Sequence, residues 1–368
     1  MKIAILGTRG IPNNYGGFEQ FAEYISEGLV LRGHDVTVYN PHFHPYNESG
    51  YKGVKLIKKY SPESLLGAAA NFLYDYLCFK DALKKEFDII LECGYHSNAP
   101  SYYLKGKRHK SVLITNMDGI EWKRSKWSPI TRQLIRSLEK LAVAKSDILV
   151  SDNIGIQEYY KSEFNADSYF IAYGANLVTD YDETLLLKYK LEKKLYYCLI
   201  ARIEPENNIE LILDGYVKSK SNLPFIVIGG KNNQFAKYLI AKYQNENIHF
   251  IGGVYDIQDL NAMRKFAAAY FHGHSVGGTN PSLLEAMASD SNIVSHNNEF
   301  NKSVLGNGAL YFTNSDDVKS IISNELYIEN SDYRIRQNRK NIENKYSWDI
   351  IIDQYESLFY KSIKKDKL

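Results

Sequence analysis

The sequence lacks any long apolar segment, since no hydrophobic run approaches the roughly 18 residues that a membrane-spanning helix needs. Its first residues, MKIAILGTRG, have the pattern of a strand and a glycine turn and lack the long apolar region of a signal peptide. Cysteine is scarce: Cys78, Cys93 and Cys198 are far apart and lie in apolar runs, which predicts buried free thiols and excludes a disulfide framework. We therefore expect a cytoplasmic protein.

Several motifs of known chemistry are also missing. No His/Cys group has the spacing of a metal site, and neither G-x-S-x-G nor a Ser-His-Asp set is present. The formal net charge is only +2, which argues against a nucleic-acid-binding protein. Asp180 and Asp182 have the Asp-x-Asp spacing of some metal sites, but they lie between two folded parts, and we interpret them as linker residues.

The chain contains two α/β halves. Its 368 residues, 44% hydrophobic and 24% charged, suit about two domains with proper cores. Strand and helix patterns alternate twice, which predicts two doubly wound, Rossmann-like units with a ligand cleft between them at the carboxyl ends of their strands. We expect a first domain over 1–178, a second over 179–346 and a carboxyl-terminal helix over 347–368 that packs back toward the first. The longest expected helices cover 18–32, 63–85, 129–144, 331–346 and 348–362.

The stretch FHGHSVGGTNPSLLEAMAS, residues 271–289, has the pattern of a strand end, a glycine loop and a helix start. Pro281 suits the first helical position, with Asn280 or Thr279 as the cap. A helix start of this kind presents N–H groups and a positive dipole end to a phosphate. Glu285, one turn further, is placed to accept hydrogen bonds from ribose hydroxyls, and one of His272 and His274 is expected to face the ligand. The alternative is an ordinary strand–turn–helix connection.

Arg202 directly follows the strand pattern YYCLIA, and Glu204–Asn208 begin the next helix. A guanidinium fixed at the end of a strand is a good bidentate phosphate ligand, although a simple surface arginine would have the same pattern.

The first half offers two further candidates. Gly7–Gly10 is followed at a distance by Gly16-Gly17, so the dinucleotide fingerprint G-x-G-x-x-G is absent, but the Gly17 N–H at a helix start could bind a diphosphate or a sugar oxygen. Asp118 follows the strand at 111–115 and could hydrogen-bond sugar hydroxyls or serve as an acid or base. Packing turns and a helix cap are the structural alternatives.

Basic residues gather between Lys105 and Lys145, where eleven Lys/Arg face three acidic residues, a local balance of 11 − 3 = +8. Trp122 and Trp127 lie within this region. Such a composition suits an anionic membrane surface or a pyrophosphate-bearing acceptor, and equally a solvated helix face.

Taken together, the segments GTRGIPNNYGGFE, MDGIEWKRSKW, SDNIGIQEYY, IAYGA, ARIEPENNIE and HGHSVGGTNPSLLEAMA resemble retaining glycosyltransferases of the GT-B fold, family 4-like, over nearly the whole chain. The bacterial branch that transfers L-rhamnose is the most similar. The resemblance implies two Rossmann-like domains facing a central cleft and a metal-independent reaction without a cofactor. It also implies a dTDP- or UDP-sugar donor and a lipid-pyrophosphate-linked saccharide acceptor at the inner face of the plasma membrane.

The resemblance also implies site residues. Arg202, Asp118 and Glu285 would be catalytic. Donor binding would involve Gly16, Gly17, Arg202, Asn207, Gly252, His274, Gly277, Gly278, Thr279, Asn280, Ser282, Leu283 and Glu285. Acceptor binding would involve Arg9, Tyr15, Glu121, Lys123 and Arg124.

Two positions depart from the family pattern. The lysine usual five residues after the arginine is replaced by Asn207, and the first of two glutamates eight apart is replaced by Gly277. A positive phosphate ligand and a sugar-binding carboxylate are therefore missing, which would suit a sugar without a 6-hydroxyl group, such as rhamnose.

Other functions stay open at this point. A sugar-nucleotide 2-epimerase shares the two-domain architecture and could use Asp118 and His274 as acid and base. A transferase of another UDP- or GDP-sugar and a non-catalytic nucleotide-sugar-binding protein also fit, whereas the absent fingerprint disfavours a nicotinamide oxidoreductase.

Overall fold

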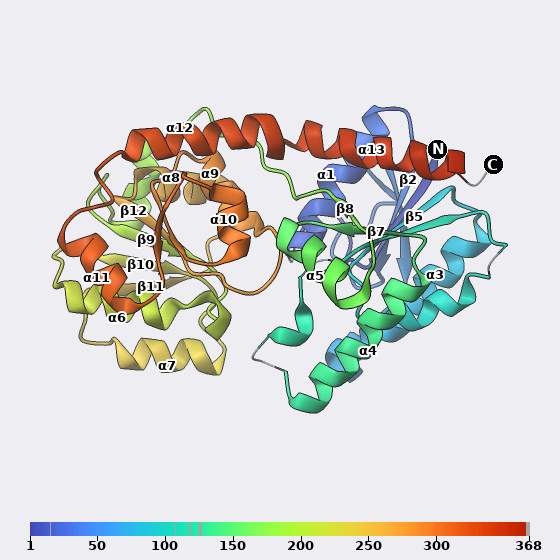
Figure 1. The fold of residues 1–368 in the computed structure, drawn as a ribbon, viewed down its shortest axis with the longest axis horizontal. Coiled ribbons are helices and arrows are strands. Elements are labelled where there is room, and N and C mark those ends of the chain that lie inside the picture. Colours follow the sequence, from blue (N-terminus) through green and yellow to red (C-terminus); the bar gives the residue numbers. More distant parts are fainter. Residues whose placement is uncertain (15, 107, 118, 125–126, 366–368) are drawn as a thin grey trace. The chain divides into compact units, whose positions relative to one another are not determined.

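The computed structural model describes residues 1–14, 16–106, 108–117, 119–124 and 127–365. The chain divides into two compact units, shown in Figure 1. Unit 1 contains Met1–Tyr173 together with the segment from Trp348 onward, and unit 2 contains Gly174–Ser347. The expected boundary at 178/179 lies five residues beyond the one in the structure, and the carboxyl-terminal helix belongs to unit 1.

Unit 1 is built on an eight-stranded sheet with the order β3-β4-β2-β1-β5-β6-β7-β8. All neighbouring strands are parallel except β3 and β4, which form a short antiparallel hairpin. The strands are β1 Lys2–Leu6, β2 Asp35–Pro41, β3 Gly50–Tyr51, β4 Val54–Lys59, β5 Ile89–Cys93, β6 Val112–Asn116, β7 Ile148–Ser151 and β8 Tyr169–Phe170.

Helices cover both faces of this sheet, which is why its central strands are almost wholly apolar. In Figure 1, α1 and α13 lie on one side and α3 and α4 on the other. Ile3, Ile5 and Leu6 of β1 are fully buried between β2 and β5. The helices are α1 Gly17–Leu31, α2 Glu63–Leu66, α3 Ala70–Lys84, α4 Pro129–Lys145, α5 Ile154–Phe164 and α13 Trp348–Lys365.

The single long helix predicted over 63–85 is wrong. The structure has α2, a 3₁₀ turn at Gly67–Ala69 and then α3. Gly67, at the carboxyl end of α2, has φ +53°, a conformation that glycine adopts without the steric cost of a Cβ atom and that ends the helix.

Helix α13 packs on α1 within unit 1. The rings of Tyr24 and Trp348 stack with centroids 4.6 Å apart, and Phe21 meets Tyr355 edge-on at 5.3 Å. The end of the interface is polar, where His34 Nε2 lies 2.7 Å from Glu356. Apolar burial therefore holds the last helix against the first.

Unit 2 is built on a six-stranded parallel sheet with the order β11-β10-β9-β12-β13-β14. The strands are β9 Tyr197–Ile200, β10 Phe225–Ile228, β11 Ile248–Gly252, β12 Ala269–His272, β13 Ile293–His296 and β14 Leu310–Phe312. Tilted and edge-on aromatic rings, among them Tyr197, Phe225 and Phe271, fill part of its core.

Helices α6, α7 and α11 lie on one side of this sheet in Figure 1, and α8, α9 and α12 lie on the other. The helices are α6 Ile209–Ser219, α7 Gln234–Lys242, α8 Ile257–Phe266, α9 Pro281–Ala288, α10 Glu299–Leu305, α11 Ser315–Ser323 and α12 Ser331–Asn341. The helix predicted over 331–346 ends earlier, because a π turn at Ile342–Tyr346 follows α12. The short helix α10 was missed, since its seven residues are too few for a clear apolar period.

Among the helices that the structure describes, none combines the length and the hydrophobicity of a membrane span.

Candidate functional site

The strand order of unit 2 reverses between β9 and β12. From β9 the chain adds β10 and β11 on one side, and it then returns to place β12, β13 and β14 on the other. Loops leaving neighbouring strands in opposite directions open a crevice at the carboxyl edge, where parallel α/β sheets bind their ligands. The loop after β9, residues 201–208, and the loop after β12, residues 273–280, therefore form the candidate site.

Arg202 lies at the start of the first loop with an exposed side chain. Its carbonyl oxygen accepts hydrogen bonds from Asn207 Nδ2 at 2.7 Å and from the Glu204 N–H at 2.9 Å, which fixes the backbone of the turn. Among the residues that the structure describes, no hydrogen-bond or ion-pair partner of its guanidinium is present. A fixed backbone and an available guanidinium suit an anionic ligand.

Asn207 connects the two loops. Its side chain is buried, and its amide nitrogen is already a donor to Arg202 O, so its oxygen is the atom that lies 2.9 Å from His274 Nδ1. An amide oxygen can only accept, and His274 Nδ1 must therefore carry the proton. Both ends of the Asn207 amide are thus engaged in holding the loops together.

Further hydrogen bonds attach the loop after β12 to its surroundings. Asn208 Nδ2 donates to Gly273 O at 2.7 Å, and both the N–H and the hydroxyl of Ser275 donate to Glu206 O. The carbonyl of His274 accepts from the side chains of Asn298 and Asn301 at 3.0 and 2.9 Å. His272, in β12, is buried, and desolvation lowers its pKa to about 3, so His272 is neutral and His274 is the partly exposed member of the pair.

The helix start has the predicted cap. Asn280 Oδ1 accepts from the N–H groups of Ser282 at 2.9 Å and of Leu283 at 3.4 Å, with Pro281 at the first helical position. A phosphate at these two N–H groups would have to replace the cap. Gly277 has φ +117°, which is strained for any residue with a side chain, whereas Gly278 is half-buried and Thr279 is buried.

Glu285 is held by a residue that sequence reasoning missed. Arg264 of α8 is only 1% exposed, and its Nη2 donates to Glu285 Oε2 at 2.5 Å and lies 3.5 Å from Ser282 Oγ. The Glu285 side chain is 24% exposed, so a ligand can reach it. No local pattern identifies Arg264, because one arginine within the amphipathic helix α8 is ordinary until the fold buries it.

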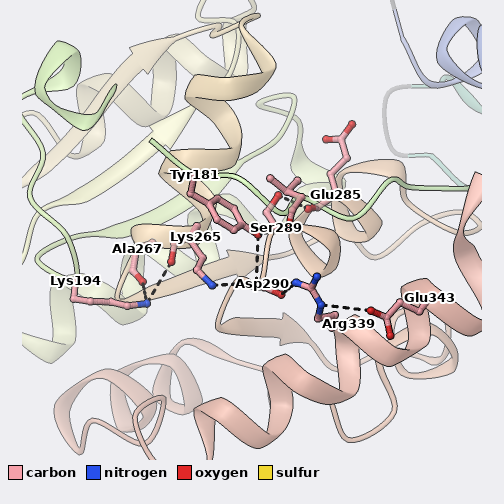
Figure 2. Close-up of polar contacts among 10 residues, drawn as sticks. Tyr181, Lys194, Lys265, Ala267, Glu285, Ser289, Asp290, Arg339 and Glu343 are labelled. Carbon is pink, nitrogen blue, oxygen red and sulfur yellow. Dashed lines mark hydrogen bonds and ion pairs between the residues drawn. The ribbon is translucent and has the colours of Figure 1, made fainter. Parts of the chain in front are cut away.

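A separate polar network lies at the other end of α9. Figure 2 shows the Asp290 carboxylate between Tyr181, Lys265 and Arg339, while the Glu285 carboxylate points away from this group. Lys265 Nζ lies 3.1 Å and Arg339 Nη1 3.3 Å from Asp290 Oδ2. The network connects the linker and three helical segments of unit 2, and we assign it a structural role. Gly252 ends β11 with φ +91°, and its carbonyl accepts from the Gly229 N–H at 2.9 Å.

In unit 1, Gly16 caps α1 and Gly17 is its first residue, as expected. The buried carboxylate of Glu19 lies at this helix start, where its Oε1 accepts from the Arg9 N–H at 2.8 Å. The Arg9 guanidinium itself pairs with Glu63 at 2.8 Å. A diphosphate at Gly17 would therefore lie beside a carboxylate, which favours a sugar oxygen among the two ligands considered for this N–H.

The predicted acceptor residues near Trp122 all have partners within unit 1. Arg124 Nε lies 2.6 Å from Glu121, and Lys123 lies over the rings of Trp122 and Tyr159 at 5.7 and 5.6 Å. Asp118 and Tyr15, predicted as a catalytic and an acceptor residue, lie outside the described residues. Among those described, no group of three or more His, Cys, Asp and Glu side chains could hold a metal ion.

Two buried carboxyl groups in unit 1 were also missed. Glu92 of β5 is 1% exposed and Asp75 of α3 is 4% exposed. Asn98 Nδ2 donates to Glu92, and Ser97 Oγ donates to Asp75. Burial raises the pKa of Asp75 to about 7, and burial together with the nearby Asp75 charge raises the pKa of Glu92 well above its usual range. A glutamate inside the apolar strand IILEC was the available sequence signal.

This pair predicts a pH effect on stability. A carboxyl group with a raised pKa holds its proton more tightly in the folded state, so its contribution falls as the pH rises from about 4, the unfolded value, to about 7. We expect Asp75→Asn to gain stability relative to wild type between pH 5 and pH 8, by an amount on the order of a few kcal/mol. Urea unfolding at both pH values measures this. The control is Asp35→Asn, which removes a carboxylate that pairs with Lys55 at the surface. Parallel pH profiles for wild type and Asp75→Asn would contradict it.

The close approach of the two loops in unit 2 predicts a second effect. A Cβ atom on Gly273 would lie 2.0 Å from the Asn207 carbonyl oxygen. Gly273→Ala should therefore cost about 1–3 kcal/mol and lower the Tm of unit 2 by roughly 2–4 °C per kcal/mol. Thermal unfolding measures the shift, and Gly230→Ala, which would meet no heavy atom within 4 Å, is the matched control. Equal Tm values for the two variants would show that the loops do not constrain each other.

Comparisons with known proteins agree with this division of the chain. Residues 1–176 match a family model described as a domain of unknown function, DUF1972, and residues 186–346 match the model of glycosyl transferases group 1. No curated protein sequence matches the chain.

Solved structures show the same fold. Sucrose-phosphate synthase from Thermosynechococcus elongatus superposes with a TM-score of 0.80 at 14% identity, with 99% of each chain covered. Anabaena Alr3699/HepE in complex with UDP has a TM-score of 0.73 at 14% identity, covering 98% of this chain and 100% of that one. TarM has a TM-score of 0.71 at 12% identity, covering 98% and 99%. The chain thus has the GT-B fold of glycosyltransferases, and its second unit carries a glycosyl transferases group 1 domain.

Proposed function

We propose that the protein transfers L-rhamnose from dTDP-rhamnose to a lipid-linked saccharide during cell-surface polysaccharide synthesis, with retention of the anomeric configuration. One observation carries the proposal. Within the domain that matches glycosyl transferases group 1, Arg202 has an available guanidinium at the β9/β12 edge, two residues beyond Ile200, whose carbonyl accepts from Ser282 Oγ of α9 at 3.4 Å.

The proposed chemistry is electrostatic. When the sugar–oxygen bond breaks, negative charge develops on the departing diphosphate. Arg202 neutralises part of this charge, and the N–H groups of the 277–280 loop and the positive end of α9 stabilise the remainder. The Asn207 hydrogen bonds fix the Arg202 backbone and the His274 ring before the reaction, and the proposal needs no metal ion or other cofactor.

The rhamnose assignment rests on the sequence resemblance and on Gly277. The position where the resemblance leads us to expect a sugar-binding carboxylate has no side chain, and its φ of +117° disfavours any other residue. A 6-deoxy sugar presents one hydroxyl group fewer to that pocket. Glu285, oriented by Arg264, would accept a hydrogen bond from the pentose of the nucleotide. In dTDP this pentose is deoxyribose, which offers the 3′-hydroxyl.

UDP-sugars are the main alternative donors, because Alr3699/HepE has been solved with UDP and with UDP-glucose. Turnover assays with dTDP-rhamnose, UDP-glucose and a GDP-sugar, each with and without a lipid-pyrophosphate-linked saccharide, test the proposal. Turnover only in the presence of acceptor supports a transferase. Conversion of the donor alone would instead indicate the 2-epimerase, and turnover of UDP-glucose alone among the donors would overturn the rhamnose assignment.

Arg202→Ala should lower kcat about 10²–10³-fold, because the charge that it stabilises exists mainly in the transition state. The dTDP affinity should fall less. Steady-state kinetics and calorimetry separate the two effects. Arg336→Ala, an exposed arginine of α12 in the same unit, is the matched control. An unchanged kcat for Arg202→Ala would remove Arg202 from the mechanism.

We further propose that α4 contacts the anionic inner face of the plasma membrane. Ile130 and Leu134, one turn apart on α4, are 83% and 54% exposed, and Arg136 and Lys140 are exposed on the same helix. Exposed aliphatic and basic side chains on one helix supply the two contributions, apolar burial and attraction to anionic headgroups, that bind peripheral proteins to anionic lipid. We therefore assign the membrane contact expected for the basic region Lys105–Lys145 to this one helix.

Binding to vesicles that contain phosphatidylglycerol should fall several-fold for Ile130→Ser/Leu134→Ser, and also for Lys140→Glu. The loss caused by Lys140→Glu should shrink at high salt, whereas the loss from the double variant should persist. Co-sedimentation measures both. Leu31→Ser, which alters another exposed leucine of unit 1, is the control. Normal sedimentation of both α4 variants would mean that the basic helix is merely solvated.

A further inference from the structure

A carboxyl group is buried beneath helix α4 in unit 1. Glu139 of α4 is 0% exposed. Its Oε1 accepts from the hydroxyl groups of Tyr160 at 3.0 Å and of Tyr95 at 3.3 Å, and its Oε2 accepts from the hydroxyl group of Tyr159 at 2.9 Å. Tyr95 lies in the loop after β5, and the other two tyrosines are neighbours on α5. Three phenol groups from two other parts of the unit thus meet at one carboxyl group.

This burial has a cost that packing alone does not explain. Burial raises the pKa of the Glu139 carboxyl group, and the three tyrosine hydroxyl groups oppose that rise. An apolar side chain would hold α4 against α5 without the desolvation cost of a carboxylate. What a carboxylate adds is direction, because its oxygens accept only from donors placed within a limited range of angles. Glu139 therefore indicates that some group must be held in a defined orientation.

Tyr159 connects this group to the surface. Tyr95 and Tyr160 are at most 1% exposed, whereas Tyr159 is half-buried. The Tyr159 hydroxyl group, which donates to Glu139, also accepts from Trp122 Nε1 at 3.0 Å. A hydroxyl group can donate and accept at once, so the indole, the phenol and the carboxylate form one chain of hydrogen bonds. The chain leads from the 3₁₀ turn at Glu121–Lys123 to α4.

The ring of Trp122 is also held by cations. Arg136 Cζ, from α4, lies 5.0 Å from the ring centroid, and Lys123 Nζ lies 5.7 Å from it. Arg136 is in turn paired with Glu163 of α5 at 3.0 Å. The indole therefore has its N–H directed by the hydrogen-bond chain and its ring placed by cations from α4 and from its own turn.

Fixing Trp122 also fixes the residues next to it. The Glu121 carboxylate accepts from Arg124 Nε at 2.6 Å and from Trp127 Nε1 at 3.0 Å. The turn and the arginine after it are thus attached to α4 through Trp122. Glu121, Lys123 and Arg124 are the expected acceptor residues of this segment, and α4 is the helix proposed to contact the membrane.

We propose that Glu139 and Tyr159 are positioning residues, which hold the segment Glu121–Arg124 on α4 in the orientation that binds the saccharide acceptor. The proposal rests on the proposed glycosyltransferase function. Neither residue has to touch the acceptor. Because α4 also carries the proposed membrane contact, the segment keeps a constant place relative to the lipid surface that presents the acceptor.

Two variants of the full-length protein test this proposal. Tyr159→Phe removes the hydroxyl group between Trp122 and Glu139 and keeps the ring. Glu139→Gln keeps the size of the side chain and removes its charge. Tyr159→Phe leaves Glu139 two of its donors, so it serves as the test if Glu139→Gln folds poorly. The matched controls are Tyr169→Phe in β8 and Glu158→Gln in α5, which alter exposed residues of the same unit.

Steady-state kinetics with dTDP-rhamnose and a lipid-pyrophosphate-linked saccharide give the first readout. Tyr159→Phe should raise the KM for the saccharide about threefold to tenfold, because one hydrogen bond that orients its binding segment is lost. The donor KM and the kcat at saturating saccharide should change by less than about twofold. Glu139→Gln should raise the saccharide KM at least as much. A merely structural role would lower the Tm and leave the saccharide KM unchanged.

The indole N–H resonances give a second readout that needs no substrate. The protein has three tryptophans, and Trp122→Phe assigns the resonance of Trp122. Tyr159→Phe should shift the resonances of Trp122 and of Trp127, whose N–H donates to the neighbouring Glu121. The resonance of Trp348, which stacks on Tyr24 in another part of unit 1, should stay in place.

Unchanged resonances of Trp122 and Trp127 in Tyr159→Phe would overturn the proposal. So would an unchanged saccharide KM in both variants, or a donor KM that rises as much as the saccharide KM. Failure of the glycosyltransferase proposal looks different, because wild type would then turn over no donor with the saccharide. The tryptophan resonances would still decide whether Glu139 and Tyr159 hold the segment.

Discussion

Each unit depends on one topological constraint, a parallel sheet that grows in both directions from a central strand. In unit 1 the reversal lies between β1 and β5, and in unit 2 between β9 and β12. Loops that leave these neighbouring strands diverge, and their backbone groups need other partners. In unit 2, asparagine side chains are these partners. Asn208 and Asn298 donate to the carbonyl groups of Gly273 and His274, and Asn207 accepts from the His274 ring. The same reversal thus opens a binding edge and determines which side chains must support it.

Burial of polar side chains around these edges orients the groups proposed to act. Arg264 is removed from water to hold Glu285, and Asn207 is removed from water to hold His274 and the turn at Arg202. Each arrangement costs desolvation free energy that good geometry only partly returns. The gain is a side chain whose direction is set before a ligand arrives, which matters most where charge develops during a reaction.

The sequence predicted features that depend on neighbouring residues. The cap at Asn280, the helix start at Pro281 and the buried stripe of Leu283, Leu284 and Met287 follow from local spacing, and the structure has them. Features that depend on distant contacts were missed. Arg264 and Asp75 look like surface residues of amphipathic helices until the fold places Glu285 of α9 and Glu92 of β5 beside them. The break at Gly67 was missed because a glycine within a helical pattern is often tolerated.

The two departures from the family pattern lie in the two adjoining loops of the candidate site, residues 201–208 and 273–280. Asn207 uses its amide nitrogen on Arg202 and its oxygen on His274, so a lysine at 207 would lose the acceptor that holds His274. Gly277, three residues beyond His274, has a φ of +117° that a glutamate would strain. Because the 202–208 and 273–275 segments are hydrogen-bonded to each other, a change in one alters the support of the other. Neither departure is therefore an isolated loss of a charged group, and restoring one residue alone would disturb the loop pair that holds Arg202 in place.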